Sequence, residues 1–217
     1  SCAKAMNLTH YDRVCIPVPL YHWFGMVLGT LACCAAGATM IYPSEGFEPD
    51  KTMHALKSES CTAVHGVPTM FSAMLASSEF DGKPIKSLRT GIMAGSQCPE
   101  VLMRRVLYDL GCSEITIAYG MTETSPISFQ SDVNDPVDVR VSTVGRIQPH
   151  CEVKIVEDDG STCAVGQTGE LWTKGYLVMK GYWNDTEATQ SSIENGWMKT
   201  GDLATIDNEG FCRIVGR

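Results

Sequence analysis

The stretch YGMTETSP, residues 119–126, combines side chains that can together hold a nucleotide and a metal ion. Tyr119 offers a flat ring that can stack on a base, and Thr122 offers a hydroxyl for a phosphate oxygen. Glu123 offers a carboxylate, a hard oxygen ligand of the kind that Mg²⁺ takes beside substrate phosphates. The alternative is a purely structural junction between a strand and a loop, because Thr and Ser are also common turn residues.

Three further loops carry residues of the same kind. PLYHWFG (19–25) contains His22, HGVPT (65–69) contains His65, and AGSQCP (94–99) contains Gly95, Ser96 and Gln97. Gly95 lets the backbone approach a ligand closely, so that its peptide groups can read polar edges. Each loop follows a short apolar run, and in an open parallel sheet ligands bind outside the carboxyl ends of the strands. We therefore expect the four loops to line one edge of a sheet.

The elements that must position these loops alternate between strand and helix length over residues 11–120. Apolar runs at 13–18, 38–42, 61–67, 88–95 and 114–120 predict strands, and segments near 22–36, 50–58, 69–77 and 99–110 predict helices. Pro68 and Pro99 suit a first helical turn, and Asp50 is a candidate cap. This alternation predicts an α/β fold, with a largely parallel sheet covered by helices on both faces.

After about residue 140 the helical signal weakens. Short strands are predicted within 151–160, 169–175 and 210–217, and one helical turn near 184–190 with Asn184 or Asp185 as its cap. These elements predict a small antiparallel, barrel-like subdomain. The polar, proline-containing segment SDVNDPVDVR marks the boundary, which divides the chain into an α/β subdomain at 1–135 and a β-rich subdomain at 136–217.

The composition is ordinary for a globular protein. Hydrophobic residues make up 44% and charged residues 19%, and the formal net charge is -8. That charge argues against nucleic acid or an anionic membrane as a partner, whereas a small anion needs only a local positive potential. The uncharged run between Arg13 and Glu45 is broken by Pro17, Pro19 and Pro43, so we expect no transmembrane span.

The ten cysteines form no C-x-x-C pattern, and several lie in apolar runs. We therefore expect reduced, core-filling thiols of an intracellular compartment rather than disulfides. The common signatures G-x-x-x-x-G-K-[ST], G-x-G, H-E-x-x-H and G-x-S-x-G are also absent from the sequence. Their absence argues against a P-loop kinase, a dehydrogenase, a zinc hydrolase and a serine esterase.

Five blocks of the sequence resemble the adenylate-forming family of acyl-CoA synthetases, luciferases and adenylation domains. They are PLYHWFGM, MAGSQCP, YGMTETSP, GELWTKGYLVMKGYWND and GWMKTGDLATIDNEGFCRIVGR, in the family's order and over nearly the whole chain. Within the family, YGMTETSPISFQ and VPTMF are most similar to medium-chain fatty acyl-CoA synthetases. The resemblance implies activation of a fatty acid with ATP and Mg²⁺, then transfer to CoA as co-substrate, in the mitochondrial matrix.

The resemblance also implies a role for each loop residue. Tyr119 would stack on the adenine, bordered by Gly95, Ser96 and Gln97, and Gly120 would also belong to the ATP-binding residues. Thr122 would bond the α-phosphate, Glu123 would hold Mg²⁺, and Asp202 and Arg217 would reach the ribose. His22 would lie near the acyl carboxylate and help to gate the channel, and His65 and Gly66 would line the acyl pocket. Structural alternatives remain for three of them: a turn residue for Asp202, and buried histidines for His22 and His65.

Two parts of the family pattern are not found in the sequence. The phosphate loop, of the form T-S-G-T-T-G-x-P-K-G, precedes these blocks in the family, and a small domain with a catalytic lysine follows them. The chain also starts without Met. We therefore expect an internal portion of a longer enzyme, inactive alone, with any targeting peptide upstream. The alternatives are an aryl-CoA ligase or adenylation domain and, in a different class, a non-catalytic nucleotide-binding module.

Overall fold

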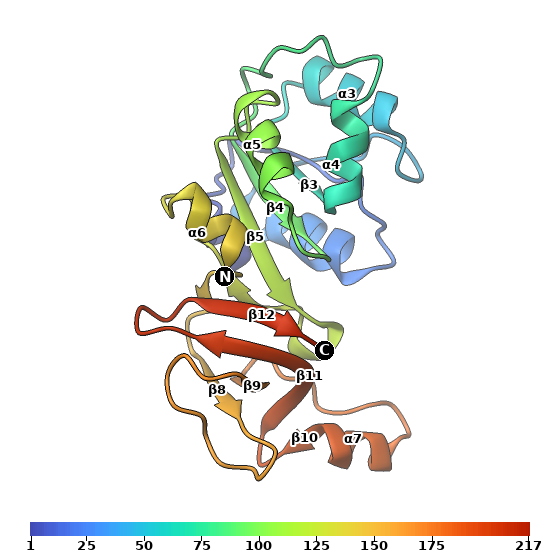
Figure 1. Ribbon diagram of the computed structural model, residues 1–217. Coiled ribbons are helices and arrows are strands. Elements are labelled where there is room, and N and C mark those ends of the chain that lie inside the picture. The colour runs from blue at the N-terminus through green and yellow to red at the C-terminus, as the bar shows by residue number, and fades with distance from the viewer. The chain divides into compact units, whose positions relative to one another are not determined.

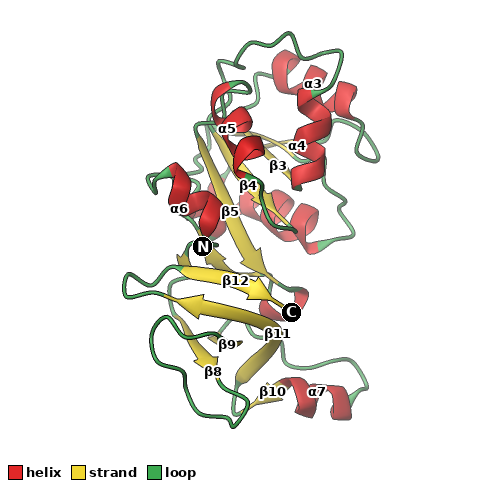
Figure 2. Ribbon diagram, in the orientation of Figure 1, coloured by secondary structure: helices red, strands yellow, loops and turns green.

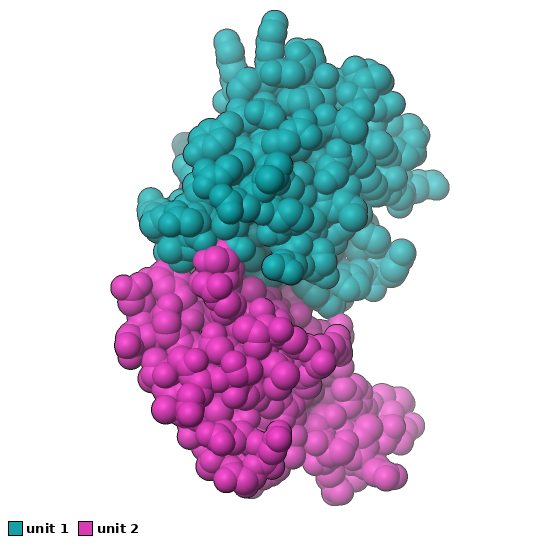
Figure 3. All heavy atoms as spheres, in the orientation of Figure 1, with its two compact units in different colours: residues 1–118, 132–141 teal, residues 119–131, 142–217 magenta.

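The computed structural model describes residues 1–217, which form two compact units (Figures 1 and 3). Unit 1 comprises Ser1–Ala118 and Asp132–Val141, and unit 2 comprises Tyr119–Ser131 and Ser142–Arg217. The predicted fold class is confirmed, with a largely parallel sheet first and a curled antiparallel sheet later. The boundary predicted at 135/136 lies within Asp132–Val141, the stretch in which the chain returns to unit 1.

Five parallel strands in the order β2-β1-β3-β4-β5 form the sheet of unit 1. They are β1 (Arg13–Cys15), β2 (Thr39–Ile41), β3 (Ala63–Gly66), β4 (Thr90–Ala94) and β5 (Glu114–Gly120). All residues of β3 and β4 are buried, as expected for central strands covered on both faces. Ala94 pairs with Ala118, so β4 and β5 reach the carboxyl edge of the sheet together.

Helices connect these strands (Figure 2). They are the π-helix η1 (Phe24–Leu31), which continues into α2 (Ala32–Ala36), then α3 (Pro49–Ser58), α4 (Pro68–Leu75) and α5 (Glu100–Tyr108). The chain moves one way across the sheet from β1 to β2 and the other way from β2 to β5. Right-handed crossovers therefore place η1 and α2 on one face and α3, α4 and α5 on the other. The direction reverses at β1, so the loops after β1 and β3 flank a topological switch point.

The predicted helix starts are mostly confirmed. Pro49 and Pro68 begin α3 and α4, and Pro99 is the N-cap residue of α5. The capping prediction for Asp50 is wrong, because Glu48 is the N-cap residue of α3 and Asp50 lies in its first turn. There Asp50 accepts a hydrogen bond from the Ser77 hydroxyl (2.5 Å) instead. The short helices α1 (Cys2–Ala5) and α6 (Val137–Ser142) were not predicted.

Unit 2 is built from antiparallel strands around a small core of its own. The elements are the 3₁₀ turn η2 (Thr122–Thr124), β6 (Ile127–Gln130), β7 (Arg146–Ile147), β8 (Cys151–Val156), β9 (Gly169–Gly175), α7 (Thr186–Ser192), β10 (Ile193–Glu194), β11 (Trp197–Ile206) and β12 (Cys212–Gly216). Strands β8 to β12 form one sheet in the order β10-β11-β9-β8, with β12 also paired to β11, and β6 pairs antiparallel with β7. Phe129, Leu171 and Ala204 are buried in the core. As predicted, Asp185 caps α7, accepting from the Ala188 N–H (2.9 Å).

The cysteine and membrane expectations can also be compared with the structure. All ten cysteines are free thiols. Cys15, Cys33, Cys61, Cys98, Cys112 and Cys212 are buried, so they fill the core as expected. Burial raises the pKa of Cys98 to about 11, which keeps this thiol protonated and unreactive near neutral pH. No helix in residues 1–217 combines the length and apolarity needed to cross a membrane.

Candidate nucleotide site

Tyr119 and Asp202 meet in unit 2 although they are far apart in the sequence. The Tyr119 phenol donates a hydrogen bond to Asp202 Oδ2 (2.6 Å), and the ring packs edge-on against Phe129, with 6.2 Å between centroids. Burial, with the bond to the Asp202 carboxylate, raises the pKa of Tyr119 well above its usual value. The phenol is therefore a protonated donor throughout the neutral range. An aromatic ring and a carboxylate this close match the adjacent base and ribose of one nucleoside.

A bulge in β11 places Asp202. Between Lys199 and Leu203, β11 advances four residues while β9 advances only two, from Trp172 to Glu170. Extra residues in one strand bend it and redirect a side chain, and bulges are common next to functional sites. Asp202 therefore lies in a strand bulge and not in the turn that was its structural alternative.

The bulge is held by its own hydrogen bonds. The Thr200 hydroxyl donates to the Leu171 carbonyl (2.7 Å) and accepts from the Asp202 N–H (3.1 Å). Gly201 has a φ of 71°, which an L side chain rarely adopts, and its N–H donates to Glu170 Oε1 (3.0 Å). Thr200 therefore anchors the bulge to β9, and Gly201 allows the backbone to turn. The side chain of Asp202 stays 17% exposed.

The two threonines that flank Glu123 have different environments. Thr124 is fully buried, and its hydroxyl bonds the carbonyls of Met121 and Pro126 (both 3.1 Å). Thr122 is exposed on the same 3₁₀ turn. Thr124 therefore shapes the loop, whereas Thr122 is exposed to solvent, and its role at the α-phosphate stays a prediction.

Gly120 is required by the path of the backbone. A Cβ atom at this position would lie 1.7 Å from the Pro126 carbonyl oxygen, a distance that real atoms cannot adopt. The loop thus folds back directly over Gly120. The contact of Gly120 with the nucleotide stays a prediction, and the structure gives the residue a role in the loop itself.

Glu123 is half-buried and is held at two points. Its carbonyl accepts from the Met179 N–H (2.9 Å), and its carboxylate oxygen Oε1 accepts from the Tyr182 phenol (2.9 Å). That carboxylate raises the pKa of Tyr182 because it stabilises the protonated phenol. Sequence reasoning missed Tyr182, and no local signal marks it, because it lies 59 residues from Glu123.

The donor set fits a magnesium ion that arrives with a nucleotide. No group of three His, Cys, Asp or Glu side chains in residues 1–217 is arranged to hold a metal ion. Mg²⁺ usually keeps several waters and binds one or two carboxylates together with substrate phosphates. One restrained carboxylate beside an exposed hydroxyl meets that requirement. A metal ion held by protein ligands alone would need more ligating side chains than these two.

Arg217 is close to Asp202, with 3.7 Å between Nε and Oδ1. The Arg217 side chain is 82% exposed, so this ion pair contributes little to stability. The guanidinium is nevertheless near the carboxylate predicted to bind the ribose. Its predicted role at the same sugar stays a prediction.

In unit 1 the loop after β4 is open to solvent. Gly95, Ser96 and Gln97 are all exposed, and Gly95 has a φ of 96°. A Cβ on Gly95 would lie 3.0 Å from Val67 Cγ1, so this loop runs directly beside the loop after β3. The expected grouping of loops at the carboxyl edge is present for these two strands.

The two predicted histidines have opposite environments. His22 is exposed, so the buried alternative for it is wrong, and its Nδ1 accepts from the Phe24 N–H (3.1 Å) at the start of η1. His65 is fully buried, and its Nε2 bonds the Leu28 carbonyl of η1 (3.0 Å). Burial lowers the pKa of His65 to about 4, so the ring is neutral. The enclosed position favours the structural interpretation of His65, and Gly66 beside it is also buried, against Phe71.

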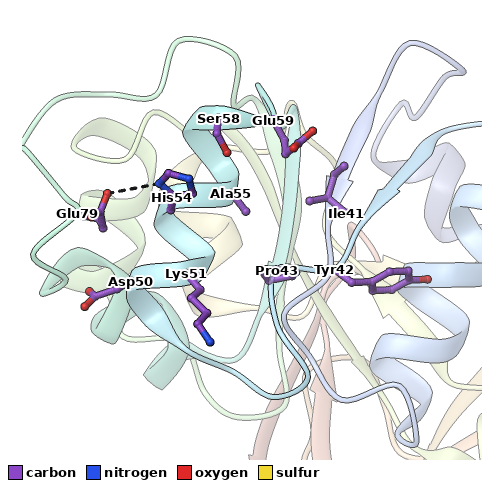
Figure 4. Close-up of a pocket in the computed structure, with 10 residues that line it drawn as sticks. All are labelled: Ile41, Tyr42, Pro43, Asp50, Lys51, His54, Ala55, Ser58, Glu59 and Glu79. Carbon is purple, nitrogen blue, oxygen red and sulfur yellow. Dashed lines mark ion pairs between the residues drawn. The ribbon is translucent and has the colours of Figure 1, made fainter.

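A separate concavity of about 510 Å³ lies beside α3 in unit 1 (Figure 4). Its lining includes Asp50, Glu59 and Glu79 but only one lysine, Lys51. His54 faces Glu79, with 4.0 Å between Nδ1 and Oε2. An excess of carboxylates repels phosphate groups, and no residue predicted for the nucleotide site lines this concavity. It is therefore not the nucleotide site.

Comparison with known proteins adds three similarities. The putative acyl-CoA synthetase YngI of Bacillus subtilis is 52% identical over 99% of this chain and 39% of its own length. The mitochondrial medium-chain acyl-CoA ligase ACSF2 of Danio rerio is 42% identical over 94% of this chain and 34% of its own length. The O-succinylbenzoate coenzyme A synthetase MenE of Bacillus subtilis, in complex with ATP and magnesium ion, aligns with a TM-score of 0.86 at 30% identity, over 99% of this chain and 44% of that chain.

The chain thus spans 39% and 34% of the two curated relatives' lengths. The family model described as AMP-binding enzyme matches residues 1–183. Together with the fold and with the similarity to medium-chain ligases, this match confirms the resemblance seen in the sequence blocks. The chain belongs to the AMP-binding, or adenylate-forming, enzyme family.

Proposed function

We propose that the protein containing this chain activates a fatty acid, of medium chain length, to an acyl-adenylate and then to an acyl-CoA. The observation that carries the proposal is the Tyr119–Asp202 hydrogen bond beside the Thr122–Glu123 turn, in a member of the AMP-binding family. The acyl class follows the name of the Danio rerio relative. That relative is also named mitochondrial, and a matrix location belongs to the same proposal, although the Bacillus subtilis relative is bacterial.

Unit 2 supplies the nucleotide contacts in this proposal. The Tyr119 ring lies against the adenine, and the Asp202 carboxylate accepts hydrogen bonds from the ribose hydroxyls, with Arg217 nearby. The Thr122 hydroxyl donates to an oxygen of the α-phosphate. Glu123 provides a carboxylate oxygen for Mg²⁺. Charge-assisted bonds of the carboxylate type are stronger than neutral ones, so Asp202 contributes most to nucleoside affinity.

The remaining predicted site residues lie in unit 1. Gly95, Ser96 and Gln97 have an exposed backbone, which suits the role at a base predicted for them, and the exposed His22 suits its predicted role at an acyl carboxylate. His65 and Gly66 support the acyl pocket from within the core rather than through direct contact, because both are buried.

The reaction has two displacement steps. First, a carboxylate oxygen of the acid attacks the α-phosphorus of ATP, and the bond to pyrophosphate breaks. Second, the CoA sulfur attacks the acyl carbon, AMP leaves with the electron pair of the acyl–oxygen bond, and the thiol proton is lost to solvent. Mg²⁺, when bound, neutralises charge on the phosphate oxygens. The chain's own residues act by positioning and by electrostatic stabilisation, the main contributions in phosphoryl chemistry.

We further infer that these 217 residues alone bind nucleotide without turnover. The sequence contains neither the family's phosphate loop nor its lysine-bearing domain. Removal of one group that stabilises developing charge commonly costs about a hundredfold to a thousandfold in rate. Thioester formation by the isolated chain, free of any longer enzyme, would contradict this inference.

Pyrophosphate exchange by the longer protein tests the proposed function. We expect ATP–pyrophosphate exchange with medium-chain fatty acids and little exchange with aromatic acids of similar size. Exchange with aromatic acids only would instead support an aryl-CoA ligase. Absence of exchange with every acid, together with nucleotide binding, would support the non-catalytic binding module.

A further inference from the structure

We propose that Tyr182 is a positioning residue for the metal-binding carboxylate of Glu123, and that the turn before α7 supports this pair. The inference rests on the proposed function, in which Glu123 holds Mg²⁺. It adds a residue to which neither the sequence motifs nor the chemistry above gave a role. It also gives a reason why a segment 59 residues away from Glu123 matters for the site.

The phenol of Tyr182 restrains one oxygen of the carboxylate and leaves the other available. Its hydroxyl donates to Glu123 Oε1 (2.9 Å), and a carboxylate has lone pairs on both oxygens. A metal ion can therefore bind at Oε2 while Oε1 keeps its donor. Carboxylates that bind metals are commonly held by hydrogen bonds of this kind, which fix their orientation before the ion arrives.

The segment that starts α7, labelled in Figure 1, in turn holds Tyr182. Its N–H donates to the Thr189 hydroxyl (2.9 Å), and that hydroxyl donates to the Asp185 carbonyl (2.7 Å). Asp185 also caps α7 through the Ala188 N–H. Hydrogen bonds at the start of α7 therefore position the backbone of Tyr182.

Gly181 makes this arrangement possible. Its φ is 150°, and a Cβ there would lie 2.7 Å from Thr189 Cγ2. Only a residue without a side chain lets the backbone pass so near Thr189. The turn thus brings residue 182 to the helix cap and its ring toward Glu123.

Tyr182 is less exposed to solvent than the aromatic residues near it in the sequence. Tyr182 is 38% exposed, whereas Trp183 is 91% and Tyr176 is 67% exposed. The segment is also tied to the Glu123 backbone, because the Met179 N–H donates to the Glu123 carbonyl (2.9 Å). Two bonds therefore join this segment to Glu123, one to its main chain and one to its carboxylate.

The test measures ATP binding to the full 217-residue chain by calorimetry, with and without Mg²⁺, in four proteins. They are the wild type, Glu123→Gln, Tyr182→Phe, and the control Tyr176→Phe, which removes an exposed phenol nearby. We expect Mg²⁺ to strengthen ATP binding in the wild type and in the control, and Glu123→Gln to remove this gain. Tyr182→Phe should reduce the apparent Mg²⁺ affinity about tenfold, the low end of the range for such supporting residues.

A purely structural effect would look different. In Tyr182→Phe, metal-free AMP binding and the thermal unfolding midpoint should stay at wild-type values. A fall in both, with unchanged Mg²⁺ affinity, would overturn the inference.

The outcomes also separate this inference from the proposed function. If Glu123→Gln loses the Mg²⁺ gain while Tyr182→Phe matches the wild type, the role of Tyr182 is wrong and that of Glu123 stands. If Glu123→Gln keeps the gain, or the wild type shows none, the metal role of Glu123 fails and the inference fails with it.

Discussion

The Tyr119 phenol and the Asp202 carboxylate share a 2.6 Å hydrogen bond, which joins the end of β5 to the bulge of β11 within unit 2. In the proposed site the first residue contacts the base and the second contacts the ribose. One bound nucleoside must therefore reach both residues, and the hydrogen bond fixes the distance between them. The bond is made at the Tyr119 hydroxyl, so it does not occupy the face of the ring on which a base would stack.

This bond should be measurable as an energetic coupling. Tyr119→Phe and Asp202→Asn each remove one partner, and the double variant removes both. We expect a coupling free energy of about 1 kcal/mol in a double-mutant cycle of urea unfolding, typical of a partly buried hydrogen bond. Additive effects, within roughly 0.3 kcal/mol, would mean that the two groups do not interact in solution.

Substitution of Gly120 tests whether the 119–126 loop folds back as described. Gly120→Ala places a methyl group into the Pro126 carbonyl, so we expect a loss of about 1–3 kcal/mol in unfolding free energy. Gly46→Ala is the matched control, because a Cβ at Gly46 meets nothing within 4 Å. Equal stabilities of the two variants in chemical denaturation would show that the loop does not close over Gly120.

The buried His65 predicts a pH dependence of stability. Its folded pKa of about 4 lies below its usual value of 6.5, so the unfolded chain binds more protons between these values. This contribution is complete above pH 6.5 and is lost as the pH falls toward 4. We expect His65 to account for about 2 kcal/mol of lost stability between pH 7.5 and pH 5.

His65→Gln is the comparison for this measurement, since its amide can still donate to the Leu28 carbonyl but does not titrate. The variant should lose less stability than the wild type over the same pH range, as read from urea midpoints. Parallel pH profiles for the two proteins would refute the assignment.

The Tyr182–Glu123 bond should be visible in the titration of the phenol. The carboxylate raises the pKa of Tyr182, because it accepts a hydrogen bond from the phenol and so stabilises its protonated form. In Glu123→Gln the pKa of this phenol should therefore fall toward its usual value, as followed by carbon NMR of labelled tyrosine. An unchanged Tyr182 titration would place the phenol and the carboxylate apart in solution.

The parallel strands of unit 1 could be predicted from the sequence because their apolar runs are continuous and their helices begin near prolines. Pro68 marks the start of α4 in the sequence as it does in the structure. The position of the loops after β3 and β4 at one edge of the sheet could be predicted because parallel strands all end at the same edge, where ligands bind. Local patterns therefore sufficed wherever one element follows another directly.

Strand β11 was missed for a physical reason. Strand prediction depends on alternation with a period of two, and the extra residues between Lys199 and Leu203 break that period at the bulge. The motif Thr-Gly-Asp therefore looked like a turn, although it lies within a strand of ten residues.

Side-chain environments were beyond local patterns as well. His22 and His65 both follow apolar runs, yet one is exposed and the other fully buried. The contact between Tyr182 and Glu123 depends on how unit 2 folds over 59 residues. Such contacts are set by tertiary packing, which a single sequence does not reveal.

The most direct test of the nucleotide site is the affinity of this chain for AMP, measured by calorimetry in the wild type and in Asp202→Asn and Tyr119→Phe. We expect Asp202→Asn to weaken binding about tenfold or more, the cost of a lost charge-assisted bond to the ribose. Tyr119→Phe keeps the ring and should stay within about threefold of the wild type, since stacking needs no hydroxyl. Wild-type AMP affinity in Asp202→Asn, or no binding by any of the three proteins, would contradict the site.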